Sequence, residues 1–579
     1  MTRFAVWAPS ADVADVEVDG TRHSMQRAER PGWWEATVDT SADSDYAFVL
    51  DGGAPLPDPR SAWQPNGVHG PSRMLDHAAF PWTDAGWRGL PLQGAILYEL
   101  HIGTFTTDGT FDAAIDRLDH LVDLGVDCVE VMPVAAFPGR HGWGYDGVAL
   151  WAVHEPYGGP LGFKRFVDAC HARGLGVVLD VVYNHLGPSG NYLDRFGPYF
   201  THRHPTPWGP AVNLAGAGSD EVRRFLVDNA LMWLRDYHVD GLRLDAVHAL
   251  VDERATHVLE QLAVEVDALA TAAGRPLFLV AESDLNDARI VTPREAGGYG
   301  LTAQWDDDIH HALHALLTGE RQGYYADFGS LACLATTLQR VFFHAGTWSS
   351  FRRRTHGRPV DVQVTPGYRF LGYLHNHDQV GNRAVGDRLS ATLAPALLQI
   401  GAALVLTAPY TPMLFMGEEW GASTPWQFFT DHQEPALAAA VRAGRRSEFA
   451  EHGWAAADIP DPQDPSTVER SRLDWAEPMR QPHAGILDFY RRLIAVRRQY
   501  PDLTDPRLDR LRVSYDEDAR WLVMHRGRLR VVVNLATRRQ AVPVDGAPAA
   551  VLLASSPGAS CGDRAVELDG PGVAIVELD

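Results

Sequence analysis

The fold of this chain is constrained most by a pattern that recurs through its middle part: a helix-like stretch, a short turn, then a run of apolar residues. The first four of these runs span residues 128–134, 175–182, 241–244 and 276–280. A run that is apolar at nearly every position is typical of a strand buried on both faces. Strands that alternate with helices in this way predict an α/β fold class with a parallel sheet.

The pattern extends over residues 93–503, which is too long for a bare doubly wound sheet. A stretch of this length suits a (β/α)8 TIM barrel with long loops after its strands. We expect the eight barrel strands to begin near Ala95, Asp127, Gly176, Gly241, Leu277, Leu301, Phe370 and Met413. A short insertion is expected at about 186–218, after the third strand.

Both ends of the chain read as β domains. In residues 1–92, short apolar runs at 3–7, 14–18, 33–38 and 46–50 are separated by turn residues, which predicts a β-sandwich. In residues 504–579, the runs 521–525, 529–534 and 573–578 predict a C-terminal antiparallel β domain. The Asp- and Pro-rich stretch 455–465 is predicted to be a surface loop.

Charge and cysteine content exclude several functions. With 74 acidic and 51 basic residues the net charge is −23, which disfavours nucleic acid and anionic membrane surfaces as partners. Lys164 is the one lysine, and its surroundings do not form a P-loop. The four cysteines are far apart, so we expect no zinc site and no disulfide framework. Without a signal peptide or a long apolar run, we expect a cytoplasmic protein.

Carboxylates gather where a (β/α)8 barrel carries its active site, at the C-terminal ends of the strands. Asp245, Glu282 and Asp378 follow the fourth, fifth and seventh predicted strands. A carboxylate at the end of a buried strand is costly unless it is paired or functional, and three together are hard to explain by structure alone. Asp180 lies inside its strand and is better explained as structural.

Glycoside hydrolysis is the chemistry that needs such carboxylates and no thiol, amine or metal. Arg243 lies two residues before Asp245, so both side chains point to the same face of the strand. The guanidinium would keep Asp245 ionised, as a nucleophile must be. Glu282 follows the apolar run 278–281, where burial would keep it protonated as an acid.

Aromatic and histidine residues near the strand ends can be interpreted in more than one way. Trp143 and Tyr145 lie between glycines, which suits a sugar-stacking platform about as well as burial. The histidines carry no HExxH motif, and two on one strand face do not make a metal site. We therefore expect no metal, and hydrogen bonding within the fold is the default explanation for each single histidine.

Four segments, 180–185, 241–248, 280–283 and 375–378, resemble in order, spacing and barrel position the signature regions of the α-amylase superfamily of glycoside hydrolases. The resemblance implies that Asp245 is the nucleophile, Glu282 the general acid/base and Asp378 the residue that stabilises the transition state. It also implies retention through a covalent β-glucosyl-enzyme and an immunoglobulin-like, glucan-binding type of N-terminal sandwich. The residues that would line the subsite of the cleaved glucose are Tyr145, His185, Arg243 and His377.

Further segments, including WDDDIHH at 305–311 and FMGEEWG at 415–421, resemble superfamily members that act on maltooligosyltrehalose. These enzymes cleave the α-1,4 bond next to the terminal trehalose and release trehalose and a maltooligosaccharide. The implied partners are maltooligosyltrehalose and α-glucan oligosaccharides, with functional coupling to a maltooligosyltrehalose synthase and no cofactor. The residues implied to recognise the trehalose end, or to assist, are Asp307, Asp308, His310, His311, His248, Gln379 and Asn382.

Two alternatives remain open at this point. A 1,4-α-glucan branching enzyme shares the sandwich, the barrel and the three carboxylates but transfers the chain to another glucan; segment 305–311 favours the hydrolase. A non-catalytic glucan-binding protein on the same scaffold typically lacks one of the carboxylates, and all three are present here.

Overall fold

A computed structural model describes residues 1–450 and 458–579 of the chain. At its centre is a closed barrel of eight parallel strands: β8 (Leu97–Leu100), β9 (Cys128–Val131), β12 (Gly176–Val181), β15 (Gly241–Leu244), β16 (Phe278–Ala281), β17 (Ala303–Trp305), β20 (Phe370–Tyr373) and β21 (Thr411–Phe415). Pairing of β21 with β8 closes the barrel. The predicted barrel is confirmed, and each strand begins within two residues of its expected position.

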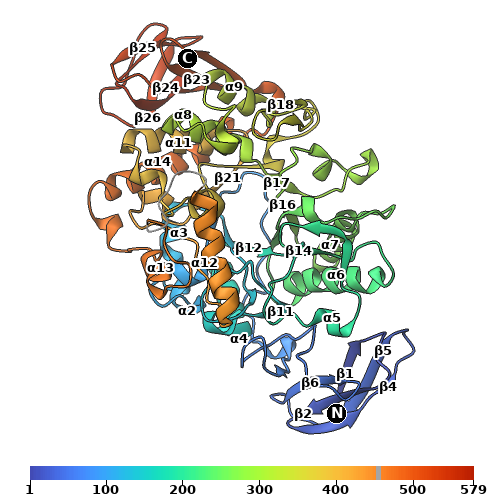
Figure 1. The fold of residues 1–579 in the computed structure, drawn as a ribbon. Helices are drawn as coiled ribbons and strands as arrows, with labels where there is room; N and C mark the ends of the chain where they lie inside the picture. Colours follow the sequence, from blue (N-terminus) through green and yellow to red (C-terminus); the bar gives the residue numbers. More distant parts are fainter. Residues whose placement is uncertain (451–457) are drawn as a thin grey trace.

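Helices surround the barrel (Figure 1). The longer ones are α3 (Leu118–Leu124), α4 (Gly159–Ala172), α6 (Ser219–Asp236), α7 (Val258–Ala273), α8 (Asp307–Thr318), α9 (Leu331–Arg340), α11 (Pro395–Thr407), α12 (Pro435–Ala450) and α14 (His483–Gln499). Helix α11 is apolar almost throughout because it packs both against α14 and against the C-terminal sheet.

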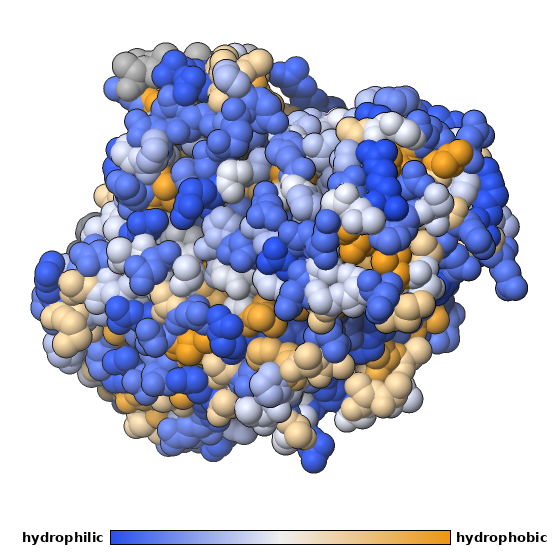
Figure 2. Space-filling model, turned by 90° about the horizontal axis from the view of Figure 1, so that it is seen from below, coloured by the Kyte–Doolittle hydropathy of each residue, from blue (hydrophilic) through white to orange (hydrophobic). Residues whose placement is uncertain are grey.

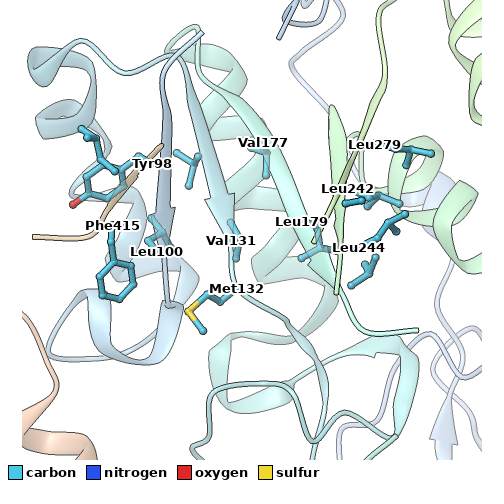
Figure 3. Packing of buried hydrophobic residues seen from close by; sticks show 14 of the residues in the cluster. Tyr98, Leu100, Val131, Met132, Val177, Leu179, Leu242, Leu244, Leu279 and Phe415 are labelled. Carbon is cyan, nitrogen blue, oxygen red and sulfur yellow. The ribbon is translucent and has the colours of Figure 1, made fainter. Parts of the chain in front are cut away.

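Side chains along each barrel strand alternate between the barrel interior and the surrounding helices. Leu97, Val178 and Val280 pack together in one interior cluster. The intervening residues pack outward, and Figure 3 shows part of that layer, with Tyr98, Leu179 and other residues on neighbouring strands. The period of two therefore directs polar residues two positions further along into the interior: Glu99, Glu130, Asp180 and Glu282.

Two antiparallel sheets form the N-terminal sandwich. One contains β1 (Thr2–Trp7), β5 (Trp33–Val38) and β4 (Gln26–Arg27), and the other β3 (Thr21–Ser24), β2 (Ala14–Val18), β6 (Asp45–Leu50) and β7 (Ser72–Arg73). The four strands expected from the sequence are β1, β2, β5 and β6. The sandwich and the C-terminal sheets lie at opposite ends of the molecule (Figure 1).

The C-terminal part is also antiparallel, as predicted. Its larger sheet has the order β22 (Arg512–Asp516), β23 (Trp521–Arg526), β24 (Leu529–Asn534), β29 (Gly572–Leu578) and β26 (Pro548–Ala554). Its smaller sheet contains β25 (Gln540–Pro543), β28 (Ala565–Leu568) and β27 (Ser560–Cys561). The expected runs form β23, β24 and β29, whereas β22, β25, β26, β27 and β28 were not predicted.

The insertion after β12 contains α5 (Leu193–Phe196) and a hairpin of β13 (Phe200–Thr206) and β14 (Gly209–Val212). Of the predicted loop 455–465, residues 455–457 lie outside the described residues. The face shown in Figure 2 is mostly hydrophilic, and its apolar patches are broken up by polar side chains. Across residues 1–450 and 458–579, no helix has both the length and the apolar character needed to cross a membrane.

The segment that leads from the sandwich into the barrel is clamped to the barrel by a buried charge network. Asp84 Oδ2 lies 2.8 Å from His171 Nδ1 and 2.9 Å from His238 Nδ1. His171 Nε2 lies 3.1 Å from Asp240, whose other oxygen accepts a hydrogen bond from Arg275. Because both ring nitrogens of His171 face carboxylates, the imidazolium form satisfies them best. Burial opposes this charge, but Asp240 and Asp84 outweigh it and raise the pKa of His171.

Asp84→Asn should lower the free energy of unfolding by about 3–5 kcal/mol, because it leaves the buried imidazolium with one partner fewer. Thermal denaturation followed by tryptophan fluorescence would measure the loss. In the wild type, the stabilisation from His171 is full below pH ~6.5 and is lost as the pH rises through its raised pKa. As a control, Asp119→Asn breaks the exposed pair with Arg173 and should change stability by about 0–1 kcal/mol. Equal losses in the two variants would contradict the clamp.

Candidate active site

One guanidinium organises the carboxylates at the top of the barrel. Arg243, on β15, is fully buried, and its NH1 lies 2.8 Å from Asp180 Oδ2 and 2.8 Å from Asp245 Oδ1. Its NH2 lies 2.8 Å from Glu282 Oε2. The plane of the guanidinium is covered by Trp305, whose ring centroid is 4.1 Å away. Three acidic side chains from neighbouring strands are thus held around one cation.

Asp245 is the carboxylate that this arrangement keeps ionised. Burial alone would raise the pKa of Asp245, but the positive charge of Arg243 and a hydrogen bond from Asn184 lower it below its usual value. The Asn184 amide donates to Asp245 Oδ2 at 2.6 Å. Asp180 behaves differently: burial raises its pKa to about 6, because Arg243 offsets only part of the effect.

Glu282 has the opposite electrostatic setting. Burial raises the pKa of Glu282 well above its usual value; Arg243 opposes the shift, and the negative charges of Asp245 and Asp378 add to it. Its Oε2 accepts a hydrogen bond from the backbone N–H of Ala246 at 2.8 Å. The pKa values of two carboxyl groups beside one arginine are therefore shifted in opposite directions, which suits a nucleophile and an acid.

Asp378 lies in the first turn of the short helix α10 (His377–Gly381). Asn376 caps this helix: its side chain accepts from the backbone N–H of Asp378, and the Gln379 side chain accepts from the backbone N–H of Asn376. This capping box fixes the turn that carries Asp378. Asn382 Nδ2 donates to Asp378 Oδ1 at 3.2 Å.

Three further predicted residues surround the carboxylates. His377 Nε2 lies 2.9 Å from the Tyr145 hydroxyl, which donates to Asp180 Oδ2 at 2.6 Å. His185 Nε2 lies 3.0 Å from the backbone oxygen of Tyr145. Burial lowers the pKa of His185.

These groups line one cavity of about 610 Å³. The predicted residues that line it are Tyr145, His185, Asp245, His248, Glu282, Asp307, His311, His377, Asp378, Gln379 and Asn382. Arg243 lies beneath the cavity and acts on it through the carboxylates. Trp143 also lines the cavity, as a sugar-stacking side chain would. Its indole N–H donates to the backbone oxygen of Gln427 at 3.0 Å, as in a residue that is part of the packed fold.

Asp308 and His310, expected to recognise substrate, are not among the residues that line the cavity. Asp308 accepts hydrogen bonds from the backbone of Phe343 and His344, and His310 contacts the Leu374 carbonyl and the Tyr325 hydroxyl. Direct contact with substrate from these two is therefore corrected to a role inside the fold. The reason is helical geometry: positions 307 and 311 of α8 share the face toward the cavity, and 308 and 310 do not.

Loop residues that the sequence did not single out complete the cavity wall. Trp208, between β13 and β14, stacks on His185 with ring centroids 5.1 Å apart and is 46% exposed. On the other side, Tyr324 stacks on His311 at 4.8 Å, and Phe351 lies beside it at 6.0 Å. Arg352 reaches the cavity while paired with Asp284. Exposed aromatics in long loops were the available signal, but their distance in sequence hid their grouping.

Within the part of the chain that the structure describes, no group of three or more His, Cys, Asp or Glu side chains is placed to hold a metal ion.

Comparison with known proteins identifies the family. The model described as alpha amylase, catalytic domain, matches residues 83–203, and a domain of unknown function, DUF3459, matches residues 506–575. The malto-oligosyltrehalose trehalohydrolase of Mycobacterium tuberculosis (strain H37Rv) is 57% identical over 580 residues, which cover all of this chain and 99% of that one. This chain belongs to the malto-oligosyltrehalose trehalohydrolase family. It is thus a glycoside hydrolase of the α-amylase superfamily.

Two other comparisons place the chain among enzymes that act on α-glucans. A solved structure from Salmonella typhimurium, assigned as an alpha amylase, is 37% identical, with a TM-score of 0.90 over 99% of this chain and 97% of that chain. The 1,4-alpha-glucan branching enzyme GlgB of Vibrio parahaemolyticus is 36% identical over only 43% of this chain and 36% of its own. The branching-enzyme alternative is therefore supported by a partial and more distant match.

Asp245→Asn should lower kcat by about 10³-fold or more, because it removes the ionised carboxylate while keeping the size of the side chain. Initial rates of glucan hydrolysis would measure the loss, with circular dichroism as the check on folding. Near-normal turnover in a folded variant would refute the assignment of Asp245.

The two carboxyl groups also predict a bell-shaped dependence of kcat/KM on pH. The acidic limb follows protonation of Asp245, whose pKa is lowered, and the alkaline limb follows loss of the Glu282 proton, whose pKa is raised. Glu282→Gln should be slow on glucans, yet it should still release fluoride from an α-glucosyl fluoride, since that leaving group needs no proton. A variant equally impaired on both substrates would contradict the acid assignment.

Proposed function

We propose that this chain hydrolyses, with retention of configuration, the α-1,4 bond next to the terminal trehalose of maltooligosyltrehalose. The products are trehalose and a maltooligosaccharide. The observation that carries the proposal is the cavity in which Asp245, Glu282 and Asp378 meet, in a chain 57% identical over its full length to malto-oligosyltrehalose trehalohydrolase.

In the first step, an Asp245 oxygen attacks C1 of the glucose on the non-reducing side of the scissile bond. Glu282 gives its proton to the departing oxygen of trehalose, and a covalent glucosyl-enzyme forms. Asp245 and Glu282 contact adjacent nitrogens of the same guanidinium, at 2.8 Å each. Such closeness suits a retaining mechanism, which needs the two carboxyl groups near each other.

In the second step, a water molecule takes the place of the departed trehalose. The Glu282 carboxylate accepts a proton from the water as its oxygen attacks C1, which frees Asp245 and regenerates the acid. Asp378 stabilises the positive charge that develops on the sugar ring in both transition states. Tyr145, His185 and His377 hold the glucose that carries this charge.

We place the trehalose in the half of the cavity beyond Glu282. Asp307 and His311 face it from α8, and Tyr373 and Gln379 hold Asp307 through hydrogen bonds of 2.6 Å and 3.2 Å. His248 lines the same half of the cavity, as does the aromatic wall of Tyr324 and Phe351. Flat apolar side chains next to fixed acceptors suit the faces and hydroxyls of a disaccharide.

We also propose three features that concern the whole chain. The division into residues 1–92, 93–503 and 504–579 follows the sheets, with the first part a glucan-binding type of sandwich. Functional coupling to a maltooligosyltrehalose synthase follows from the substrate, which such an enzyme would supply. A cytoplasmic location is supported by the four free cysteines.

Incubation with maltotriosyltrehalose and, separately, with maltopentaose tests the proposal. We expect free trehalose and maltotriose from the first substrate and little cleavage of the second, measured by chromatography of the products. The Asp245→Asn variant is the control for contaminating activity. Equal hydrolysis of both substrates would overturn the proposal, and new α-1,6 branches in amylose would support the branching-enzyme alternative.

A further inference from the structure

A buried carboxylate on the first barrel strand binds His377 from behind the active site. Glu99 on β8 is 1% exposed, and its Oε1 lies 2.5 Å from His377 Nδ1. Its Oε2 accepts a hydrogen bond from the backbone N–H of His377 at 3.0 Å. Both oxygens of Glu99 therefore act on one residue, fixing the ring through Nδ1 and the start of α10 through the backbone.

This contact is the far end of a continuous series of hydrogen bonds and ion pairs. His377 Nε2 contacts the Tyr145 hydroxyl at 2.9 Å, and that hydroxyl donates to Asp180 at 2.6 Å. Arg243 joins Asp180 to Asp245. The order of the series is Glu99, His377, Tyr145, Asp180, Arg243 and Asp245. With Nδ1 bonded to Glu99, the Nε2–H of the ring donates to the Tyr145 hydroxyl, whose own proton goes to Asp180.

We propose that Glu99 is a positioning residue that keeps His377 as an imidazolium, with Nε2 directed at the Tyr145 hydroxyl beside the catalytic carboxylates. The cation then donates a charge-assisted hydrogen bond to the Tyr145 hydroxyl, which lines the substrate cavity, and it balances the negative charge of Asp378. The catalytic consequence rests on the proposed function, whereas the protonation state of His377 does not.

The charges around His377 support an imidazolium. Burial lowers the pKa of His377, but Asp378 and Glu99 outweigh this effect and Arg243 opposes them only partly, so its pKa lies at about 9. Of the other titratable groups nearby, burial raises the pKa of Glu130 well above its usual value, and burial lowers that of His101 to about 3. Burial raises the pKa of Asp180 to about 6 and that of Tyr145 as well.

The neighbouring strand offers a matched control. Glu130 on β9 lies directly opposite Glu99 in the register of the sheet and is also 1% exposed. Among the described residues, neither oxygen of Glu130 has a hydrogen-bond partner. Glu130→Gln therefore changes the same kind of side chain at the same depth of the barrel without removing a bond to His377.

The test follows the titration of His377 in the full-length protein by NMR, with ¹⁵N-labelled histidine and the His377→Asn variant to assign the signal. Glu99→Gln should lower the pKa of His377 by about 1–3, since an opposite charge in contact is lost. Glu99→Asp, which keeps the charge, should lower it less, and it serves as the test if the glutamine variant does not fold. Glu130→Gln should leave the titration close to that of the wild type.

Activity provides the second measurement. At pH 7, Glu99→Gln should reduce kcat/KM about 10–100-fold on any glucan that the wild type cleaves, while Glu99→Asp recovers part of the loss. An unchanged His377 titration in Glu99→Gln, or an equal shift in Glu130→Gln, would overturn the inference. Failure of the wild type to release trehalose would instead count against the proposed function, because the NMR titration needs no substrate.

Discussion

The pairing of the Arg243 guanidinium with three carboxylates is the interaction on which the active site depends. Asp180 and Asp245 could not both be ionised in the interior of a barrel without a cation, because a buried, unpaired charge is strongly unfavourable. In the register of β12, β15 and β16, Arg243 lies opposite Asp180 and Val280, and Asp245 and Glu282 each follow two residues further along their strands. An arginine suits this place better than a lysine, since its planar fork contacts several oxygens at once and keeps its charge.

The same cation contacts two acidic side chains, Asp245 and Glu282, whose pKa values are shifted in opposite directions. It contacts Asp245 closely enough to overcome burial, whereas at Glu282 burial and the neighbouring negative charges prevail. The difference arises from surroundings and not from residue type, since an amide from Asn184 reaches only the first of the two. Around this centre, the loops after the strands build the cavity wall, and the capped turn at Asn376 brings Asp378 to it from the opposite side.

Local periodicity made the barrel and the three carboxylates predictable from the sequence. Most barrel strands are buried and largely apolar; Asp245 and Glu282 directly follow β15 and β16, and Asp378 lies in the short helix that follows β20. The direction in which the Asp308 and His310 side chains point could not be predicted from local periodicity, because it depends on how α8 is rotated against the barrel. Trp208 and Phe351 come from loops whose course follows long-range packing. Glu99 was hidden because it stands inside an apolar strand, where a lone acid looks structural.

Lys164 packs against the segment that leads from the sandwich into the barrel. Its ammonium donates to the His77 carbonyl at 2.9 Å and lies over the rings of Phe80, Trp82 and Tyr237. The side chain is fully buried, and no other lysine occurs in the sequence. Acetylation, methylation and ubiquitination of lysine therefore have no exposed target on this chain, and amine-reactive labels cannot attach to a side chain on its surface.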